Sequence, residues 1–199
     1  MGSDANRLRR KWQDYSGQNA GSAEMDFFKT FEVLFEGTEY KIRSKPNEFN
    51  KIYLDVELSE QEKREIFTPK EEIKKHGVFP DFAIDNTETG KTIYIEVKRQ
   101  DGWVEGKKRS AGRGNAHERS CKFFTPGLQK ILREKGNLNA DVLPFWVIFQ
   151  GDITRDPCRV REITCWYYGY SAHYFFWRNT KEKLPLINHF LEKIKPLLH

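Results

Sequence analysis

The sequence contains 199 residues, of which 38% are hydrophobic and 14% aromatic, enough for a real core and too aromatic for a disordered chain. No stretch approaches the roughly 20 apolar residues of a membrane helix, and the polar N-terminus lacks the apolar centre of a secretory signal. Three cysteines at irregular spacing exclude a disulfide framework and a paired-cysteine zinc site. We therefore expect a soluble cytoplasmic protein without membrane association, formed by a single domain over residues 1–199 with a flexible, basic arm over residues 1–20.

The charge balance is mildly basic, because 34 Lys and Arg residues against 29 Asp and Glu give a formal net charge of +5. This excess permits a polyanionic partner such as nucleic acid, but a solvated charged surface is the simpler explanation of the sum alone. The positions of particular residues have to decide between the two.

The first predicted element is a helix that Ser22 caps and Gly37 ends, with apolar residues at helical spacing between them. A capping box at residues 59–62 then begins a short helix that Pro69 closes.

A β-hairpin is predicted next. Residues 79–84 and 92–98 have the composition of strands, and residues 85–90 between them are dense in turn formers. The chain then adds a loop over 101–116, a helix over 116–135 interrupted near Pro126, and a buried central strand over 143–149. Asp156 and Pro157 begin the next helix, whose apolar face carries Val160, Ile163 and Tyr167. A strand over 174–177 and a final amphipathic helix follow, and the apolar residues of that helix are Leu186, Ile187, Phe190, Leu191 and Ile194. Strands between helices predict an α/β fold with a mixed β-sheet flanked by helices.

The hairpin carries the first chemical signal, which is Pro80-Asp81, then fourteen intervening residues, then Glu96-Val97-Lys98. The two-residue period of a strand places Glu96 and Lys98 on one face and Val97 on the other. If Asp81 begins the paired strand, its carboxylate lies beside that of Glu96. Two adjacent carboxylates repel each other unless a hard divalent cation lies between them, and Mg²⁺ suits a site with few protein oxygens. Alternating charges on a solvated strand face are the competing interpretation.

This spacing resembles the PD-(D/E)xK nuclease family, whose core is such a hairpin in a mixed sheet. The resemblance implies that Asp81 and Glu96 hold Mg²⁺ and that Lys98 serves the attacking water and the scissile phosphate.

A second signal lies in the segment Gly112-Arg113-Gly114-Asn115-Ala116-His117-Glu118-Arg119. Arginine and asparagine side chains are the ones best shaped for the edges of guanine and adenine, and the flanking glycines allow close approach to another surface. A polar loop leading into an exposed helix is the alternative. We call residues 112–119 the DNA-reading segment below.

The DNA-reading segment resembles the recognition segment of EcoRI-type Type II restriction endonucleases, which read an AATT core. Its neighbourhood is similar to the members of that group that cut CAATTG. The resemblance runs with gaps from about residue 22 to 180, and residues 151–157 belong to it. Carried over to this chain, it implies that Asn115, Ala116, Glu118 and Arg119 read the inner AATT, that Arg113 reads the outer base pair, and that Gly114 and His117 belong to the DNA-binding segment.

The resemblance implies a homodimer that hydrolyses both strands of a palindromic double-stranded site in a restriction-modification system. Cleavage after the C of CAATTG would leave 5′ AATT overhangs, and an adenine-N6 methyltransferase would protect the host genome. A structure-selective repair or junction nuclease on the same fold, and a DNA-binding regulator without catalysis, are the other functions considered. The first would not need Arg113, Asn115 and Arg119, and the second predicts a broken set of catalytic residues, whereas Asp81, Glu96 and Lys98 are all present.

The remaining reactive residue types show no site pattern. The five histidines lack metal-ligand spacing, and His117 has two roles open to it, contact with the DNA backbone or internal packing. Cys121 has no activating partner and is expected to be a buried small residue. Trp103, Trp146, Trp166 and Trp177 are expected to pack in the core or a dimer interface.

Overall fold

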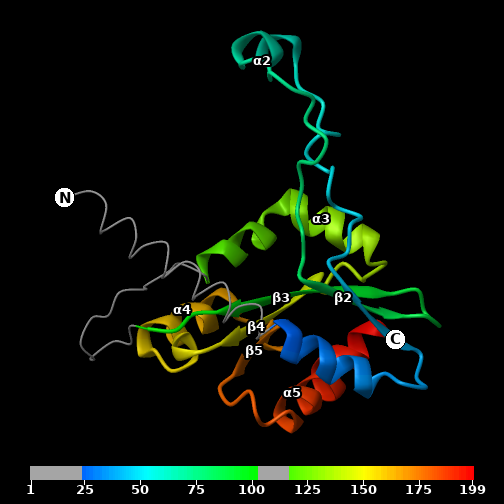
Figure 1. Cartoon of the computed structure of the whole chain (residues 1–199), viewed down its shortest axis with the longest axis vertical. Coiled ribbons are helices and arrows are strands. Elements are labelled where there is room, and N and C mark those ends of the chain that lie inside the picture. Colours follow the sequence, from blue (N-terminus) through cyan, green and yellow to red (C-terminus); the bar gives the residue numbers. More distant parts are fainter. Residues whose placement is uncertain (1–23, 103–116) are drawn as a thin grey trace.

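The computed structural model describes residues 24–102 and 117–199 and shows a five-stranded mixed sheet with helices on both sides (Figure 1). The strands, in the order in which they lie side by side, are β1 (Tyr40–Ser44), β2 (Phe82–Asn86), β3 (Thr92–Arg99), β4 (Phe145–Gln150) and β5 (Tyr174–Trp177). β1, β2 and β3 pair antiparallel, whereas β3, β4 and β5 pair parallel. The predicted α/β fold with a mixed sheet is confirmed.

The helices follow the predicted order, but some predicted α-helical segments are 3₁₀ or π turns. They are a helix over residues 24–34, α2 (Glu60–Glu65), α3 (Pro126–Lys135), α4 (Pro157–Trp166) and α5 (Leu184–His189), the last continuing as a π turn over Phe190–Ile194 and a 3₁₀ turn over Lys195–Leu198. Asp156 caps α4 as predicted, since its side chain accepts from the amides of Cys158 and Arg159. No helix in the described residues is long and apolar enough to cross a membrane.

Alternate residues of β3 build two separate cores. Ile93, Ile95 and Val97 pack into one cluster, which the helix over residues 24–34 and the C-terminal helical residues cover. Tyr94 packs into the other cluster, together with residues of α3 and α4. Figure 1 shows α3 on one side of the sheet. Because both faces are covered, β3 and β4 are buried along nearly their whole length, which explains the apolar run predicted as a buried strand.

Three sequence predictions need correction. β1 was not expected, because buried and exposed side chains alternate only weakly along its five residues and its outer edge has no strand partner in the described residues. β2 begins at Phe82 and not at residue 79. The segment Glu118–Phe124 is a 3₁₀ helix and not an α-helix, and Thr125 separates it from α3.

The final helix also departs from its predicted pattern at one position. Leu186, Phe190 and Ile194 are buried as expected, but Leu191 is exposed. The π turn that begins at Phe190 shifts the following residues around the helix axis, so a strict helical period no longer describes the buried face.

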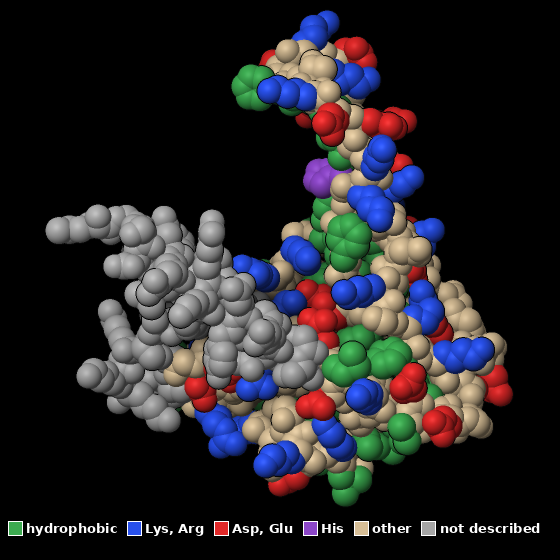
Figure 2. All heavy atoms as spheres, viewed as in Figure 1, with side chains coloured by type: hydrophobic (Ala, Val, Ile, Leu, Met, Phe, Trp, Pro, Cys, Tyr) green, Lys and Arg blue, Asp and Glu red, His purple; other side chains and the backbone are tan. Residues whose placement is uncertain are grey.

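Residues 51–79 form a stalk that carries α2 far from the sheet (Figures 1 and 2). The predicted capping box is present in α2, since Ser59 and Glu62 bond reciprocally, yet the helix buries no residue. Many of the exposed large apolar side chains of the described residues lie on this stalk: Tyr53, Leu54, Val56, Leu58, Ile66, Phe67, Ile73 and Phe79. The stalk leads directly into Asp81.

Two buried histidines should make the fold sensitive to acid. Burial lowers the pKa of His173 to about 4, although its Nδ1 contacts the carbonyl of Phe145, and burial also lowers the pKa of His189 to about 4. Between the ordinary value of about 6.5 and about 4, the unfolded chain binds more protons than the folded one, so the free energy of unfolding falls as the pH falls.

The variant His173→Asn keeps a donor for Phe145 and removes the titration. Urea unfolding at pH 7.5, 6.0 and 5.0 should show a smaller loss of unfolding free energy in this variant than in the unchanged protein, by up to about 2 kcal/mol. Equal losses in both proteins would contradict the assignment.

Candidate active site

The hairpin of β2 and β3 brings the two predicted carboxylates together. Phe82 pairs with Ile95, so the next position along the register places Asp81 opposite Glu96. Asp81 lies just before β2, and its Oδ2 accepts a hydrogen bond of 2.7 Å from the amide of Val97. The Asp81 carboxylate thus occupies the amide of Val97 in place of a backbone carbonyl of the neighbouring strand. This explains why β2 begins at Phe82, one residue after Asp81.

Lys98 lies between the two acidic groups. Its Nζ is 2.5 Å from Oε1 of Glu96 and 3.9 Å from Oδ2 of Asp81. Glu96 and Lys98 share one face of β3, as the strand period predicts, whereas Val97 packs into the apolar cluster on the opposite face. The three side chains predicted from the sequence thus form one site.

Burial raises the pKa of both carboxyl groups. For Asp81, desolvation outweighs the favourable charge of Lys98, and for Glu96 the nearby charge of Asp81 adds to desolvation. Oε2 of Glu96 is buried and has no hydrogen-bond partner among the described residues. A buried carboxylate oxygen without a partner is costly unless a cation or donor reaches it, so the site fits a hard divalent cation.

Three charged residues near this site were missed by the sequence analysis. Lys45 and Lys122 both lower the pKa of Asp81 electrostatically, and Asp81 in turn helps to raise the pKa of the half-buried Glu24, for which burial is the larger cause. Lys45 follows the unexpected strand β1 in a left-handed conformation (φ 47°), and its amide donates to the carbonyl of Asp81. Only the pairing of β1 with β2 reveals this proximity. Figure 2 shows an acidic group flanked by Lys and Arg side chains on the face viewed.

Residues of the DNA-reading segment are described only in part. Arg113, Gly114, Asn115 and Ala116 lie outside the described residues, as do Trp103 and the arm over residues 1–20. Glu118 and Arg119 are exposed at the start of the 3₁₀ helix. His117 is buried, and its ring stacks on that of Trp166 with 5.4 Å between centroids, so internal packing is the role that its surroundings describe.

The remaining candidates have structural surroundings. Trp146 and Trp177 are buried in the core. Cys121 is half-buried, less than expected, and burial raises the pKa of its thiol, which disfavours the reactive thiolate. The described residues contain no group of three or more His, Cys, Asp or Glu side chains that could hold a metal ion.

Fold and site together define the chain as a restriction endonuclease of the PD-(D/E)xK type, and comparisons with known proteins support this class. The family model described as Type II restriction enzyme MunI matches residues 1–199. The curated Type II restriction enzyme MunI of Mycoplasma sp is 51% identical over 201 residues and covers 100% of both chains. The crystal structure of MunI restriction endonuclease in complex with cognate DNA matches with a TM-score of 0.81 and 51% identity, over 94% of this chain and 97% of that one. The chain belongs to the MunI family of Type II restriction enzymes.

Removal of one carboxylate should separate cleavage from binding. We expect Glu96→Ala to abolish cleavage and to keep, or improve, sequence-specific binding without metal, because a negative charge facing DNA phosphate is lost. We expect Lys98→Ala to lower the cleavage rate by about 10² or more, since charge stabilisation near a scissile phosphate has that magnitude. Cleavage assays and binding titrations of the same preparations measure both effects.

Asp85→Asn is a matched control on β2, the strand paired with β3. Asp85 bonds Arg43 and Thr92, so its loss should lower the stability of the fold and leave cleavage intact. Cleavage by Glu96→Ala at more than about a few per cent of the unchanged rate would remove Glu96 from the catalytic group.

Proposed function

We propose that this enzyme is a Mg²⁺-dependent homodimer that hydrolyses both strands of double-stranded DNA at CAATTG. The observation that carries the chemistry is the juxtaposition of Asp81, Glu96 and Lys98 at the start of β2 and the end of β3. The sequence CAATTG rests on the resemblance of the DNA-reading segment to enzymes that cut this site. The solved MunI complex with cognate DNA supports DNA as the partner.

In the proposed mechanism, Asp81 and Glu96 hold the cation, which supplies Lewis-acid stabilisation of the phosphate. Since burial raises the pKa of both carboxyl groups, cation binding has to displace protons at low pH, and apparent metal affinity rises with pH. Lys98 adds positive charge beside the scissile phosphate and orients the attacking water. Water attacks phosphorus in line, the bond from phosphorus to the 3′ oxygen breaks, and a 5′ phosphate and a 3′ hydroxyl result.

A palindromic site explains the proposed symmetry, because two identical subunits read two identical half-sites. The proposed biological setting is a restriction-modification system in the cytoplasm, with one endonuclease domain per chain and a separate adenine-N6 methyltransferase that is not a stable subunit. Membership in the MunI family favours this function over a structure-selective nuclease or a non-catalytic regulator.

Digestion of defined DNA tests the proposal directly. With Mg²⁺, we expect cleavage of a plasmid only at CAATTG, with sequenced ends showing a four-base 5′ AATT overhang. Full methylation of adenine N6 within AATT should block cleavage, because that amino group is the major-groove donor assigned to Asn115. Cuts governed by DNA shape, or a different sequence at the ends, would contradict the proposal, and normal cleavage of methylated sites would contradict the role of Asn115.

The outer base pair provides a second prediction. The AATT-reading residues are shared by enzymes that differ outside AATT, so the additional cation Arg113 is assigned to the outer guanine, where a bidentate contact contributes about 1–3 kcal/mol of discrimination. Arg113→Ala should keep some AATT preference and lose most of the selection of CAATTG over GAATTC. Arg113→Lys should restore little, because an ammonium group lacks the planar fork.

Dissociation constants for both sites at one fixed salt concentration measure this effect. If Arg113 only clamps phosphate, its loss weakens binding to both DNAs equally. An unchanged ratio between CAATTG and GAATTC would therefore rule out the assigned base contact.

A further inference from the structure

The chain enters the region of the DNA-reading segment from the end of β3, where the connection between β4 and α4 fixes it. The amide of Gly102 donates to Oδ2 of Asp152 at 2.9 Å, and the amide of Ile153 donates to the carbonyl of Gln100 at 3.1 Å. Gly102 therefore donates to Asp152, and Gln100 accepts from Ile153.

Gly151 makes this close approach possible. Its φ is +82°, and a Cβ at this position would lie 2.5 Å from Oδ1 of Asp101 and 2.6 Å from the carbonyl oxygen of Gln100. Only glycine tolerates both the backbone conformation and the contact. Residues 151–157, which resemble CAATTG-cutting enzymes, thus include the turn that holds residues 100–102.

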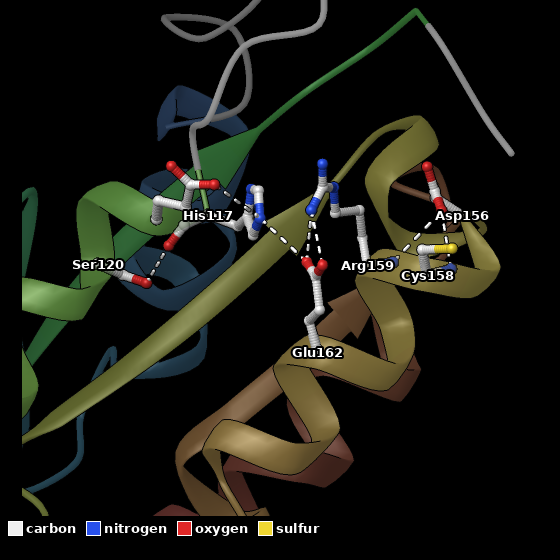
Figure 3. Close-up of polar contacts among 7 residues, drawn as sticks. His117, Ser120, Asp156, Cys158, Arg159 and Glu162 are labelled. Atoms are coloured by element: carbon white, nitrogen blue, oxygen red, sulfur yellow. Dashed lines mark hydrogen bonds and ion pairs between the residues drawn. The ribbon is translucent and has the colours of Figure 1, made fainter.

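The described part of the chain resumes at His117, which contacts α4, the helix that follows the same connection (Figure 3). The His117 ring stacks on Trp166 with an interplanar angle of 7°, and its Nε2 lies 3.3 Å from Oε2 of Glu162. Arg159 contacts both oxygens of the Glu162 carboxylate, at 2.6 and 2.8 Å. Glu162 is therefore itself oriented by a neighbour on its own helix.

The backbone of His117 also begins the following turn. Its carbonyl accepts from the amide of Ser120 at 3.1 Å and from the Ser120 hydroxyl at 2.6 Å. The imidazole is buried while the next two side chains, Glu118 and Arg119, are exposed. Burial and Arg159 lower the pKa of His117, so the neutral ring predominates near neutral pH.

We propose that Glu162, acting through His117, is a positioning residue that fixes Glu118 and Arg119 at the end of the DNA-reading segment and thereby controls discrimination between AATT and other inner sequences. Contacts with base edges require side chains placed to within about 0.5 Å, and this accuracy needs a supporting residue that is itself rigid. The inference rests on the proposed function, since it concerns the sequence that the segment reads. It assigns no part of the phosphodiester chemistry to either residue.

The test uses pairs of variants in the full-length protein. Glu162→Ala removes the contact from a partly exposed helix position, and His117→Phe keeps a ring for Trp166 but removes the polar atoms. His117→Gln retains an N–H group that can reach Glu162. The matched control is His173→Phe, because His173 is also buried but its Nδ1 contacts the carbonyl of Phe145 on β4 instead of α4.

The measured quantity is the dissociation constant for a CATATG duplex divided by that for a CAATTG duplex, at one salt concentration with Ca²⁺ in place of Mg²⁺. The two sites share the outer base pair and differ within AATT. We expect Glu162→Ala and His117→Phe each to lower the ratio by roughly tenfold, the size of one base contact. The double variant should be no worse than the single ones, because both changes remove the same link. His117→Gln should recover most of the discrimination. Thermal melting identifies any loss of folding, and the control should lower the melting temperature but leave the ratio unchanged.

Unchanged ratios in Glu162→Ala and His117→Phe would overturn the inference, and so would an equal fall in His173→Phe. An additive fall in the double variant would also contradict a shared link. If the unchanged protein does not prefer CAATTG over CATATG, the proposed function fails. A preference that the unchanged protein shows and all variants keep contradicts only the positioning role.

Discussion

The ion pair of Lys98 with the buried carboxylate of Glu96 is the interaction on which the site depends. Glu96 is only 5% exposed, and burial together with Asp81 raises its pKa. An isolated charge in such a place would be lost by protonation, so the adjacent ammonium group keeps the carboxylate usable as a ligand. The same arrangement leaves one oxygen of Glu96 without a protein partner among the described residues, and that oxygen is the feature most suited to a cation.

The strand that carries this ion pair also leads along the chain from the candidate active site toward the segment that we propose reads DNA. β3 holds Glu96 and Lys98, ends at Arg99, and continues through Gln100 into the turn held by residues 151–153. Parallel pairing places β4 next to β3, so the connection from β4 to α4 emerges at the same end of the sheet. The candidate catalytic group and Gly102 therefore lie at the same end of the β3–β4 pair, whereas His117 contacts α4, the helix that follows β4.

Much of this arrangement was predictable because local signals agreed with one another. The hairpin has a turn-rich connection between two β-prone runs, β4 has a continuous apolar run, and Asp156 with Pro157 marks the start of α4. By contrast, β1 is a short edge strand whose burial alternates weakly, and its position depends on pairing with residues forty positions away. The proximity of Lys45 and Glu24 to Asp81, and of His117 to Glu162, arises from tertiary packing and has no local pattern in the sequence.

The alternation along β3 has a consequence for how the gene can change. One face of β3 packs into a core through Ile93, Ile95 and Val97, and the other face carries Glu96 and Lys98 toward the site. A shift of one residue along the strand would therefore exchange the two faces. Loss or gain of a single codon between Thr92 and Lys98 would turn valine toward the site and a carboxylate into the apolar cluster, destroying chemistry and packing at once. The helix α2 of the stalk has no buried face that such a shift could disturb, because it buries no residue. Insertions and deletions in such enzymes are therefore expected in segments like the stalk, whereas β3 is expected to change only by substitution.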